Sequence, residues 1–292
     1  DSINQWWITD EVRYGWKFIH SEHRCTMPSV EGEAPFLEEQ APAAWSIAVA
    51  ETDRIVTEAV EAGGRLAVMV SPMLTCEDAY LLGTWVQSID PNATFAVGPV
   101  PFHGEDKTFP GGFTMRAEKA PNARGVRRVL QALGGVAPLE ADAFFKELDS
   151  ENFGAVVLCG NYPSDWISVE IKDAAMKTPF VLIDTLPNVL THAAEVVLPG
   201  ATWMEKSGTF ENVNGLFQGF LRAIDPVDYC KTESQIGIDL LAALDLGASS
   251  SFDLHMIRTQ MSSLDGLSGF VNEISEPNEE DHVESDMVYV DL

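Results

Sequence analysis

A turn at residues 160–164, Gly-Asn-Tyr-Pro-Ser, is the first candidate for chemistry because it follows an apolar run at residues 155–159. Open α/β sheets bind ligands beyond the carboxyl ends of their strands. We expect Ser164 to cap the next helix, whose free amides could hold an anionic group. A plain strand-to-helix turn would have the same sequence, so both interpretations stay open. No Gly-x-Gly-x-x-Gly fingerprint occurs here or after Val70, which disfavours nicotinamide dinucleotide binding.

Polar side chains at two further places could bind a ligand. Asp184 ends an apolar run at residues 180–183 and could accept a hydrogen bond from a ribose or pterin nitrogen, or simply cap a turn. His20, His23 and Cys25 are close enough to share a metal, but no second ligand cluster accompanies them, so we interpret them as a surface segment. No nucleophile elbow, zinc-protease motif or phosphate-binding Gly-Lys-Ser/Thr occurs, and we predict neither catalytic nor metal-binding residues.

The four cysteines are far apart and form no Cys-x-x-Cys pair. Zinc and iron–sulfur sites use closely spaced thiolates, so the sequence contains no local cluster motif. We expect buried free thiols in a reducing compartment. The residues are Cys25, Cys76, Cys159 and Cys230.

Charge is the most unusual property of the composition. The 292 residues include 18 Lys and Arg against 45 Asp and Glu, a formal net charge of −27. Such a surface repels nucleic acid and anionic lipid headgroups, so we expect neither as a partner. No apolar run approaches the roughly 20 residues that span a bilayer, and no direct membrane insertion is expected. The chain opens without Met or a signal peptide, which suggests a piece of a longer protein.

The hydrophobic pattern predicts alternating strands and helices. Short apolar runs between helical stripes are typical of parallel strands joined by right-handed crossovers. The fold class is therefore α/β, with an open, mostly parallel, doubly wound sheet. The expected strands are residues 66–70, 94–97, 155–159, 180–183 and 194–198.

Turn and cap residues predict where the helices begin and end. One helix is expected from Thr52 to Gly63, and another from Thr75, with Asp78 three residues on. Residues 99–123 are rich in Pro and Gly and predict a long loop. A helix from Ser164 to Lys177 and a last one after Thr232, with Gln235 completing a capping box, end the pattern. Shorter helices are expected at residues 126–133 and 141–148.

These elements suggest three parts of the chain. Residues 1–45 form an aromatic, irregular N-terminal arm, and residues 46–245 form the α/β domain. Residues 246–292 form a C-terminal extension whose acidic tail, from Asn272 onward, contains too little apolar sequence to order itself.

The longest distinctive motif spans residues 195–218, EVVLPGATWMEKSGTFENVNGLFQ. It predicts a buried strand, a Pro-Gly exit, a short amphipathic turn and a polar hairpin. Gly208 and Gly215 allow the backbone turns, while Thr209 and Asn212 are expected to bond to local amides.

This motif resembles the signature of the molybdopterin oxidoreductase superfamily. That signature is roughly Ala-Asp-Val-Val-Leu-Pro, then Glu-Lys-x-Gly-Thr-Phe-x-Asn and Glu-Gly-Arg-x-Gln. Residues 157–163 resemble the family's Gly-x-Asn-Pro turn, and residues 180–184 resemble the strand before its Thr-Glu-Thr. The resemblance implies a molybdopterin-oxidoreductase-like Rossmann-type fold, and it extends from the start to about Gln218.

The first residues resemble the stretch that follows the iron–sulfur modules in the large subunit of respiratory NADH:quinone oxidoreductase. Thr9 and Val12 stand where superfamily enzymes often have the Cys and Gly of Cys-x-x-Gly-Arg, so that cluster ligand is missing. The resemblance implies iron–sulfur clusters upstream of residue 1 and a location in the cytoplasm, peripheral to the inner membrane. The residues that carry it are Asn4, Trp7, Asp10, Arg13, Tyr14 and Gly15.

Two departures from the family bear on function. Residues 188–190 are Asn-Val-Leu instead of Thr-Glu-Thr, and Leu216 replaces the Arg of Glu-Gly-Arg. A pterin dinucleotide contains a diphosphate that needs cations and amides. We therefore expect a scaffold without a cofactor of its own, contacting other subunits of the NADH:quinone oxidoreductase peripheral arm, with Trp6, Trp7 and Trp16 as anchors.

Two alternatives remain. One is a small-molecule binding module that uses the crevice at residues 160–164. The other is a molybdopterin-binding oxidoreductase fragment. If a pterin cofactor is retained, its binding residues would be Asn161, Asp184, Gly208, Thr209 and Asn212.

Overall fold

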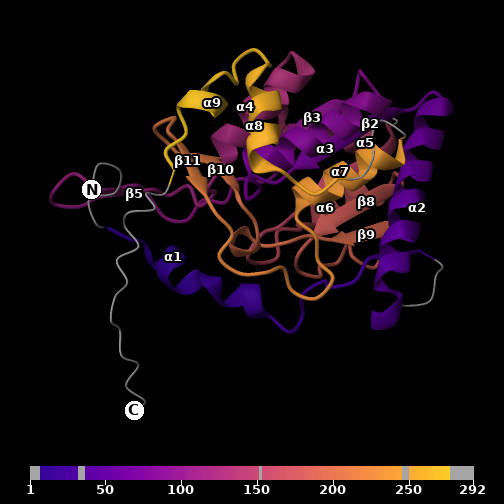
Figure 1. Cartoon of the computed structure of the whole chain (residues 1–292), viewed down its shortest axis with the longest axis horizontal. Coiled ribbons are helices and arrows are strands. Elements are labelled where there is room, and N and C mark those ends of the chain that lie inside the picture. The colour runs from indigo at the N-terminus through magenta and orange to yellow at the C-terminus, as the bar shows by residue number, and fades with distance from the viewer. Residues whose placement is uncertain (1–6, 32–36, 151–152, 245–249, 277–292) are drawn as a thin grey trace.

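A computed structural model describes residues 7–31, 37–150, 153–244 and 250–276 of the chain (Figure 1). Within these residues a seven-stranded sheet has the order β1-β9-β8-β7-β2-β3-β6. All neighbouring strands pair in parallel except β1, which pairs antiparallel with β9. The strands are β1 (Ser29–Val30), β2 (Arg65–Val70), β3 (Thr94–Val97), β6 (Leu139–Glu140), β7 (Phe153–Cys159), β8 (Phe180–Asp184) and β9 (Val196–Pro199).

Helices cover both faces of the sheet. Leu66, Val68 and Val70 of β2 face one core together with α2, α3, α4 and α7, whereas Ala67 and Met69 face a second core with α5 and α6. This alternation follows from the two-residue period of a strand. The helices are α2 (Ala41–Glu61), α3 (Cys76–Ile89), α4 (Ala123–Gly134), α5 (Ala141–Ser150), α6 (Val169–Ala175), α7 (Glu233–Ala243), α8 (Leu254–Ser262) and α9 (Gly269–Asn272).

The doubly wound α/β prediction is confirmed, and the order of the strands defines a switch point. From β2 the chain proceeds through β3 to β6, and then returns to β7 on the other side of β2. The crossover helices change face at the same place. Ligands of open α/β sheets bind at the carboxyl ends of the strands beside such a switch point. Here that edge follows Val70 of β2 and Cys159 of β7.

The predicted start of α2 was wrong. The helix begins at Ala41 instead of Thr52, with a proline in its first turn, and the Thr52 hydroxyl donates to the Ala48 carbonyl at 2.8 Å from within the helix. The predicted end was right, because Gly63 has a φ of +84°, which suits glycine. The Thr75–Asp78 capping box at the start of α3 is also confirmed.

The cap of α6 also differs from the prediction. Ser168, not Ser164, caps this helix by accepting a hydrogen bond from the Ile171 amide. Residues 160–164 therefore do not present a helix N-terminus. At α7, Thr232 caps as predicted, but the Gln235 side chain donates to Asp239 and Ser250 instead of closing a capping box.

The C-terminal extension contains more structure than predicted. Helices α8 and α9 follow α7, and their Ile257, Met261 and Phe270 are buried in the first core. Backbone hydrogen bonds fix the chain as far as Ser275, whose amide donates to the Phe217 carbonyl at 2.8 Å. The predicted disorder from Asn272 is therefore wrong for residues 272–276, and the rest of that prediction lies outside the described residues.

Three small features complete the fold. The predicted loop at residues 99–123 contains a two-stranded ribbon, β4 (Lys107–Thr108) and β5 (Thr114–Met115). The predicted polar hairpin after β9 is confirmed as β10 (Gly208–Glu211) and β11 (Phe217–Phe220). Short helices in the arm and before the hairpin are α1 (Asp10–Tyr14), η1 (Gly15–His20), η2 (Glu38–Gln40) and η3 (Trp203–Glu205).

Candidate functional site

Asn161 and Asp184 meet where β7 and β8 end. The Asn161 amide donates to Asp184 Oδ1 at 2.8 Å, and its φ of +77° is one that Asn tolerates better than most residues. Its side-chain Nδ2 donates to the Ala201 carbonyl and to Glu233 Oε1, each at 2.6 Å. Both hydrogens of the Asn161 side-chain amide group therefore have acceptors within the protein.

The Asp184 carboxylate is surrounded by donors from its own chain. It accepts hydrogen bonds from Trp166 Nε1 at 2.9 Å, from Asn188 Nδ2 at 3.0 Å and from the Thr185 amide at 2.8 Å. Burial raises the pKa of Asp184 above its usual value, and the hydrogen bonds from the Asn161 amide, Trp166 and the Thr185 amide oppose the rise. Gly160 allows this approach, because a Cβ there would lie 2.2 Å from Asp184 Oδ2.

The crevice beside the switch point is filled by Tyr162. Its hydroxyl donates to the Pro99 carbonyl at 2.8 Å, across the end of β2. A Cβ at Gly98 would lie 2.6 Å from the same hydroxyl, so the packing here is tight. Burial raises the pKa of Tyr162, which stays a neutral phenol. Residues 160–162 of the turn thus pack inward instead of framing an open crevice, whereas Pro163 and Ser164 are exposed.

Lys206 lies in the centre of a buried ionic cluster with Asp78 and Glu233. Its Nζ contacts Asp78 Oδ2 at 3.1 Å and also bonds to Glu233 Oε2. All three side chains are 3% exposed or less. Ser234 adds two hydrogen bonds to Asp78 Oδ1, from its amide at 2.8 Å and its hydroxyl at 2.5 Å. We call Asp78, Lys206, Glu233 and Asn161 the strand-end cluster.

The charges in the strand-end cluster influence one another. Burial and the nearby Asp78 carboxylate raise the pKa of Glu233 to about 7, although Lys206 opposes the rise. Burial alone would raise the pKa of Asp78, but the Lys206 charge and the Ser234 hydroxyl bring it below its usual value. Burial would lower the pKa of Lys206, but the two carboxylates raise it, so the ammonium stays charged.

Two more buried cations lie beside the cluster, each already paired. Arg24, from the N-terminal arm, bonds to Glu205 Oε1 at 2.8 Å and to the Gly200 carbonyl at 3.2 Å. Arg258 of α8 bonds to Glu77 Oε1 at 2.9 Å and also to Glu276. The arm and the C-terminal extension therefore both contribute charge to this edge of the sheet.

The remaining predicted residues lie around the β10–β11 hairpin. Thr209 was expected to bond to local amides, but its amide and hydroxyl donate to Glu77 at 2.7 and 2.6 Å. Gly208 is needed for close packing instead of a turn, since a Cβ there would lie 2.5 Å from Thr75. Asn212 does bond locally, as predicted: its Oδ1 accepts from the Asn214 and Leu216 amides at 2.9 and 3.0 Å.

The structure thus brings Asn161 and Asp184 into direct contact and places the other three candidates elsewhere. Sequence reasoning missed most of the charges that complete the site. Lys206 lay within the recognised motif, and Asp78 was assigned only a capping role. Glu205 also lay within that motif and forms a local capping box with Thr202, but its partner Arg24 is distant in the chain. The others carry no local signal, because their partners are distant: Arg24, Glu77, Glu233 and Arg258.

These residues do not fit a pterin dinucleotide. Its diphosphate would need free cations and amides, but Arg24, Lys206 and Arg258 are bonded to carboxylates of the chain. The amides of Asn161 and Thr209 likewise donate to Asp184 and Glu77. The donors that converge here are therefore already occupied.

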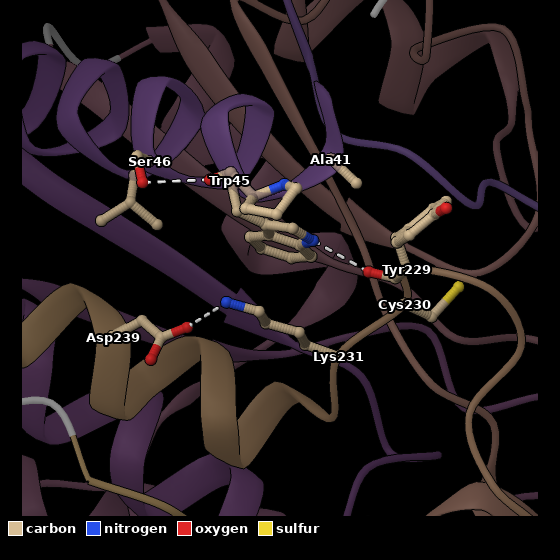
Figure 2. Close-up of a pocket in the computed structure, with 9 residues that line it drawn as sticks. Ala41, Trp45, Ser46, Tyr229, Cys230, Lys231 and Asp239 are labelled. Carbon is tan, nitrogen blue, oxygen red and sulfur yellow. Dashed lines mark hydrogen bonds and ion pairs between the residues drawn. The ribbon is translucent and has the colours of Figure 1, made fainter. Parts of the chain in front are cut away.

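A separate cavity lies between the start of α2 and the segment before α7 (Figure 2). It has a volume of about 560 Å³ and contains none of the predicted site residues. Lys231 bonds to Asp239 at 2.6 Å and lies 4.4 Å from the centre of the Trp45 ring, and Trp45 Nε1 donates to the Tyr229 carbonyl. The polar groups on its wall therefore largely satisfy one another.

The other predicted features are as follows. Cys76, Cys159 and Cys230 are buried free thiols, and Cys25 is a half-buried one. His20 and His23 are exposed, and the described residues contain no group of three His, Cys, Asp or Glu placed to hold a metal ion. No helix in the described part of the chain is both long and apolar enough to span a membrane.

Residues 133–243 match the model of the molybdopterin oxidoreductase family. This segment contains β7, β8, β9, the β10–β11 hairpin and α7, so the molybdopterin-oxidoreductase-like fold class is confirmed. A nitrate reductase of Symbiobacterium thermophilum is 30% identical over 77 residues, which are 26% of this chain and 10% of that protein. The chain therefore aligns with only about a tenth of this relative.

Two solved structures show weaker likenesses. Acetylene hydratase from Pelobacter acetylenicus is 16% identical, with a TM-score of 0.34, covering 48% of this chain and 21% of that one. A chain of the formyltransferase/hydrolase complex from Methylorubrum extorquens, solved with methylofuran, is 10% identical. Its TM-score is 0.45, covering 76% of this chain and all of that one. At these low TM-scores neither likeness carries an argument about function.

Proposed function

We propose that this chain is a scaffold unit of a molybdopterin-oxidoreductase-type complex and binds no pterin cofactor of its own. The observation that carries the proposal is the pairing of Lys206. This cation lies in the family-like motif at the carboxyl ends of the strands, and it is already paired with Asp78 and Glu233. A diphosphate would have to displace buried carboxylates that are themselves bonded to Ser234 and Asn161.

Within this class, we favour the large subunit of NADH:quinone oxidoreductase as the parent protein. The resemblance of the first residues to the stretch after the iron–sulfur modules of that subunit supports this assignment. Electron transfer from NADH to quinone would then belong to the complex, and iron–sulfur clusters to residues upstream of this chain. The partners would be neighbouring subunits of the peripheral arm, in the cytoplasm beside the inner membrane.

Elemental analysis of the purified chain tests the scaffold role. We expect molybdenum, tungsten and iron far below one atom per chain, a colourless solution, and no pterin fluorescence after denaturation. A stoichiometric pterin signal would overturn the proposal. The parent complex is tested separately: a tagged chain in its native host should migrate with NADH dehydrogenase activity on native gels, and migration with another oxidoreductase would reject that assignment.

The family match and the nitrate reductase relative favour a second candidate, a pterin-binding oxidoreductase fragment. Its binding residues would be Asn161, Asp184, Gly208, Thr209 and Asn212. In that case Asn161→Ala would abolish pterin retention. If the chain is a scaffold, this substitution changes stability alone.

A further inference from the structure

Two segments that contact each other lie at one end of the molecule and are largely exposed, apart from the buried Ile19. They are residues 7–20 of the N-terminal arm and residues 101–119, which contain the β4–β5 ribbon, and together we call them the projecting end. Figure 1 shows α1 and β5 on the side of the molecule away from α2. The ring centre of Trp7 lies 4.9 Å from that of Phe109 and 5.5 Å from that of Phe113, which joins the two segments.

Exposed apolar side chains gather on the projecting end. Among the described residues, these two short segments contain six large hydrophobic side chains that are 40–68% exposed. A concentration of this kind is typical of an interaction site, whereas single exposed hydrophobic residues are ordinary. The six are Trp7, Ile8, Val12, Tyr14, Trp16 and Phe102.

The charge of the projecting end also differs from that of the body. Its two segments contain five Lys and Arg and five Asp and Glu, so their formal charges cancel. The whole net charge of −27 therefore belongs to the rest of the chain. An apolar contact can form at a neutral surface without carrying excess charge into the interface, while the acidic body attracts cationic proteins over longer distances.

We propose that the projecting end docks a basic protein whose contact surface has an apolar centre. A second copy of this chain would bring another charge of −27, and nucleic acid or anionic lipid would be repelled as well. Charge complementarity thus favours a cationic protein over these other occupants. The inference rests on the proposed scaffold role, since it names the chemistry of one partner of the scaffold.

The test compares two double variants of the full chain with matched exposure. Val12→Ser/Tyr14→Ser alters the projecting end, at side chains 57% and 63% exposed. Val136→Ser/Val169→Ser alters side chains 72% and 70% exposed on the body. The tagged chain is used to isolate a partner from the native host, and binding of the purified partner is then measured for each variant at low and high NaCl.

The expected partner has a basic isoelectric point, and its affinity falls with salt. Val12→Ser/Tyr14→Ser weakens binding at least about tenfold, and the body variant binds like wild type. The proposal is overturned if the partner is acidic or if both variants lose the same amount of affinity for it. It is also overturned if the isolation yields no partner whose binding depends on Val12 and Tyr14. The proposal is also overturned if the wild-type chain binds itself or lipid vesicles and Val12→Ser/Tyr14→Ser abolishes that binding. Metal and pterin content of the isolated chain tests the scaffold role independently.

Discussion

At the scale of single residues, the chain resolves a conflict between burial and charge by pairing Lys206 with two carboxylates. A buried charge that loses its partner destabilises a protein by about 3–5 kcal/mol. Lys206→Met removes the cation but leaves Asp78 and Glu233 close together in the interior. We expect a loss of this size in the free energy of unfolding, measured by urea denaturation.

An exposed ion pair provides the control for this substitution. Lys177 bonds to Asp149 at the surface, with both side chains about half exposed, so Lys177→Met should change stability by less than about 0.5 kcal/mol. If Lys206→Met does not fold, the double variant Lys206→Met/Glu233→Gln should recover part of the stability, because it leaves one fewer buried charge. Equal effects of Lys206→Met and Lys177→Met would show that the buried cluster contributes little.

Glu233 makes stability depend on pH. Its pKa is raised from 4.5 to about 7 in the folded chain, so the folded state binds a proton more tightly than the unfolded state. The resulting stabilisation is complete below pH 4.5 and is lost as the pH rises through about 7. Lys206 and Asn161 bond directly to Glu233, Asp78 shares Lys206 with it, and Arg24, Cys159 and Cys230 interact with its charge.

Glu233→Gln should remove this dependence. Between pH 5 and 8 the free energy of unfolding of wild type should fall more steeply than that of the variant, because glutamine does not titrate. Buried Asp184 and Glu77 also have raised pKa values, so the variant keeps some slope of the same sign. Parallel curves for the two proteins would contradict the assignment to Glu233. Glu58→Gln, at an exposed position of α2, should follow wild type.

At the scale of elements, strands were easier to predict than the site. The β2, β3 and β7 strands are short apolar runs buried on both faces, and their pattern is local. The contact of Asn161 with Asp184 was not predicted, and it follows from the neighbouring positions of β7 and β8 in the sheet, since parallel strands end at one edge. Glu233 and Arg258 could not be predicted, because their partners lie 72 and 181 residues away.

The errors in predicting helices have two causes. Helix α2 begins in Ala-Pro-Ala-Ala-Trp, where Gln40 precedes the first turn without any side-chain capping hydrogen bond. A cap signal within the helix, at Thr52, therefore looked stronger than the true start. The C-terminal helices were missed for a different reason: α8 and α9 are short, and their order depends on packing against the β10–β11 hairpin.

The C-terminal helices should prove structurally necessary. Phe270 of α9 is 1% exposed, and its ring centre lies 4.7 Å from that of Phe217 in β11. Phe270→Ala should lower the free energy of unfolding by about 3–5 kcal/mol through lost burial and the cavity that it leaves. The next residue, Val271, is exposed, and Val271→Ala should have little effect. Chemical denaturation measures both, and comparable small losses would mean that α9 adds little to the core.

At the scale of the whole molecule, net charge and local pairing act in opposite directions. The buried pairs around Lys206, Arg24 and Arg258 are shielded from solvent ions, while the excess of Asp and Glu at the surface repels itself in the folded state. At physiological ionic strength salt largely screens the interaction of exposed charges that lie more than about 8 Å apart, but it screens buried pairs much less. Added salt should therefore relieve repulsion more than it weakens attraction.

We accordingly expect the melting temperature to rise when NaCl is increased from about 0.02 M to about 0.5 M, a range over which the Debye length falls severalfold. KCl at equal ionic strength should give the same rise if screening is the cause, whereas a difference between the salts would indicate specific ion binding. A melting temperature that falls with salt would mean that attractive surface pairs, such as Arg127–Glu140, outweigh the repulsion. The acidic surface would then be a source of stability, because its carboxylates would be engaged with cations instead of opposing one another.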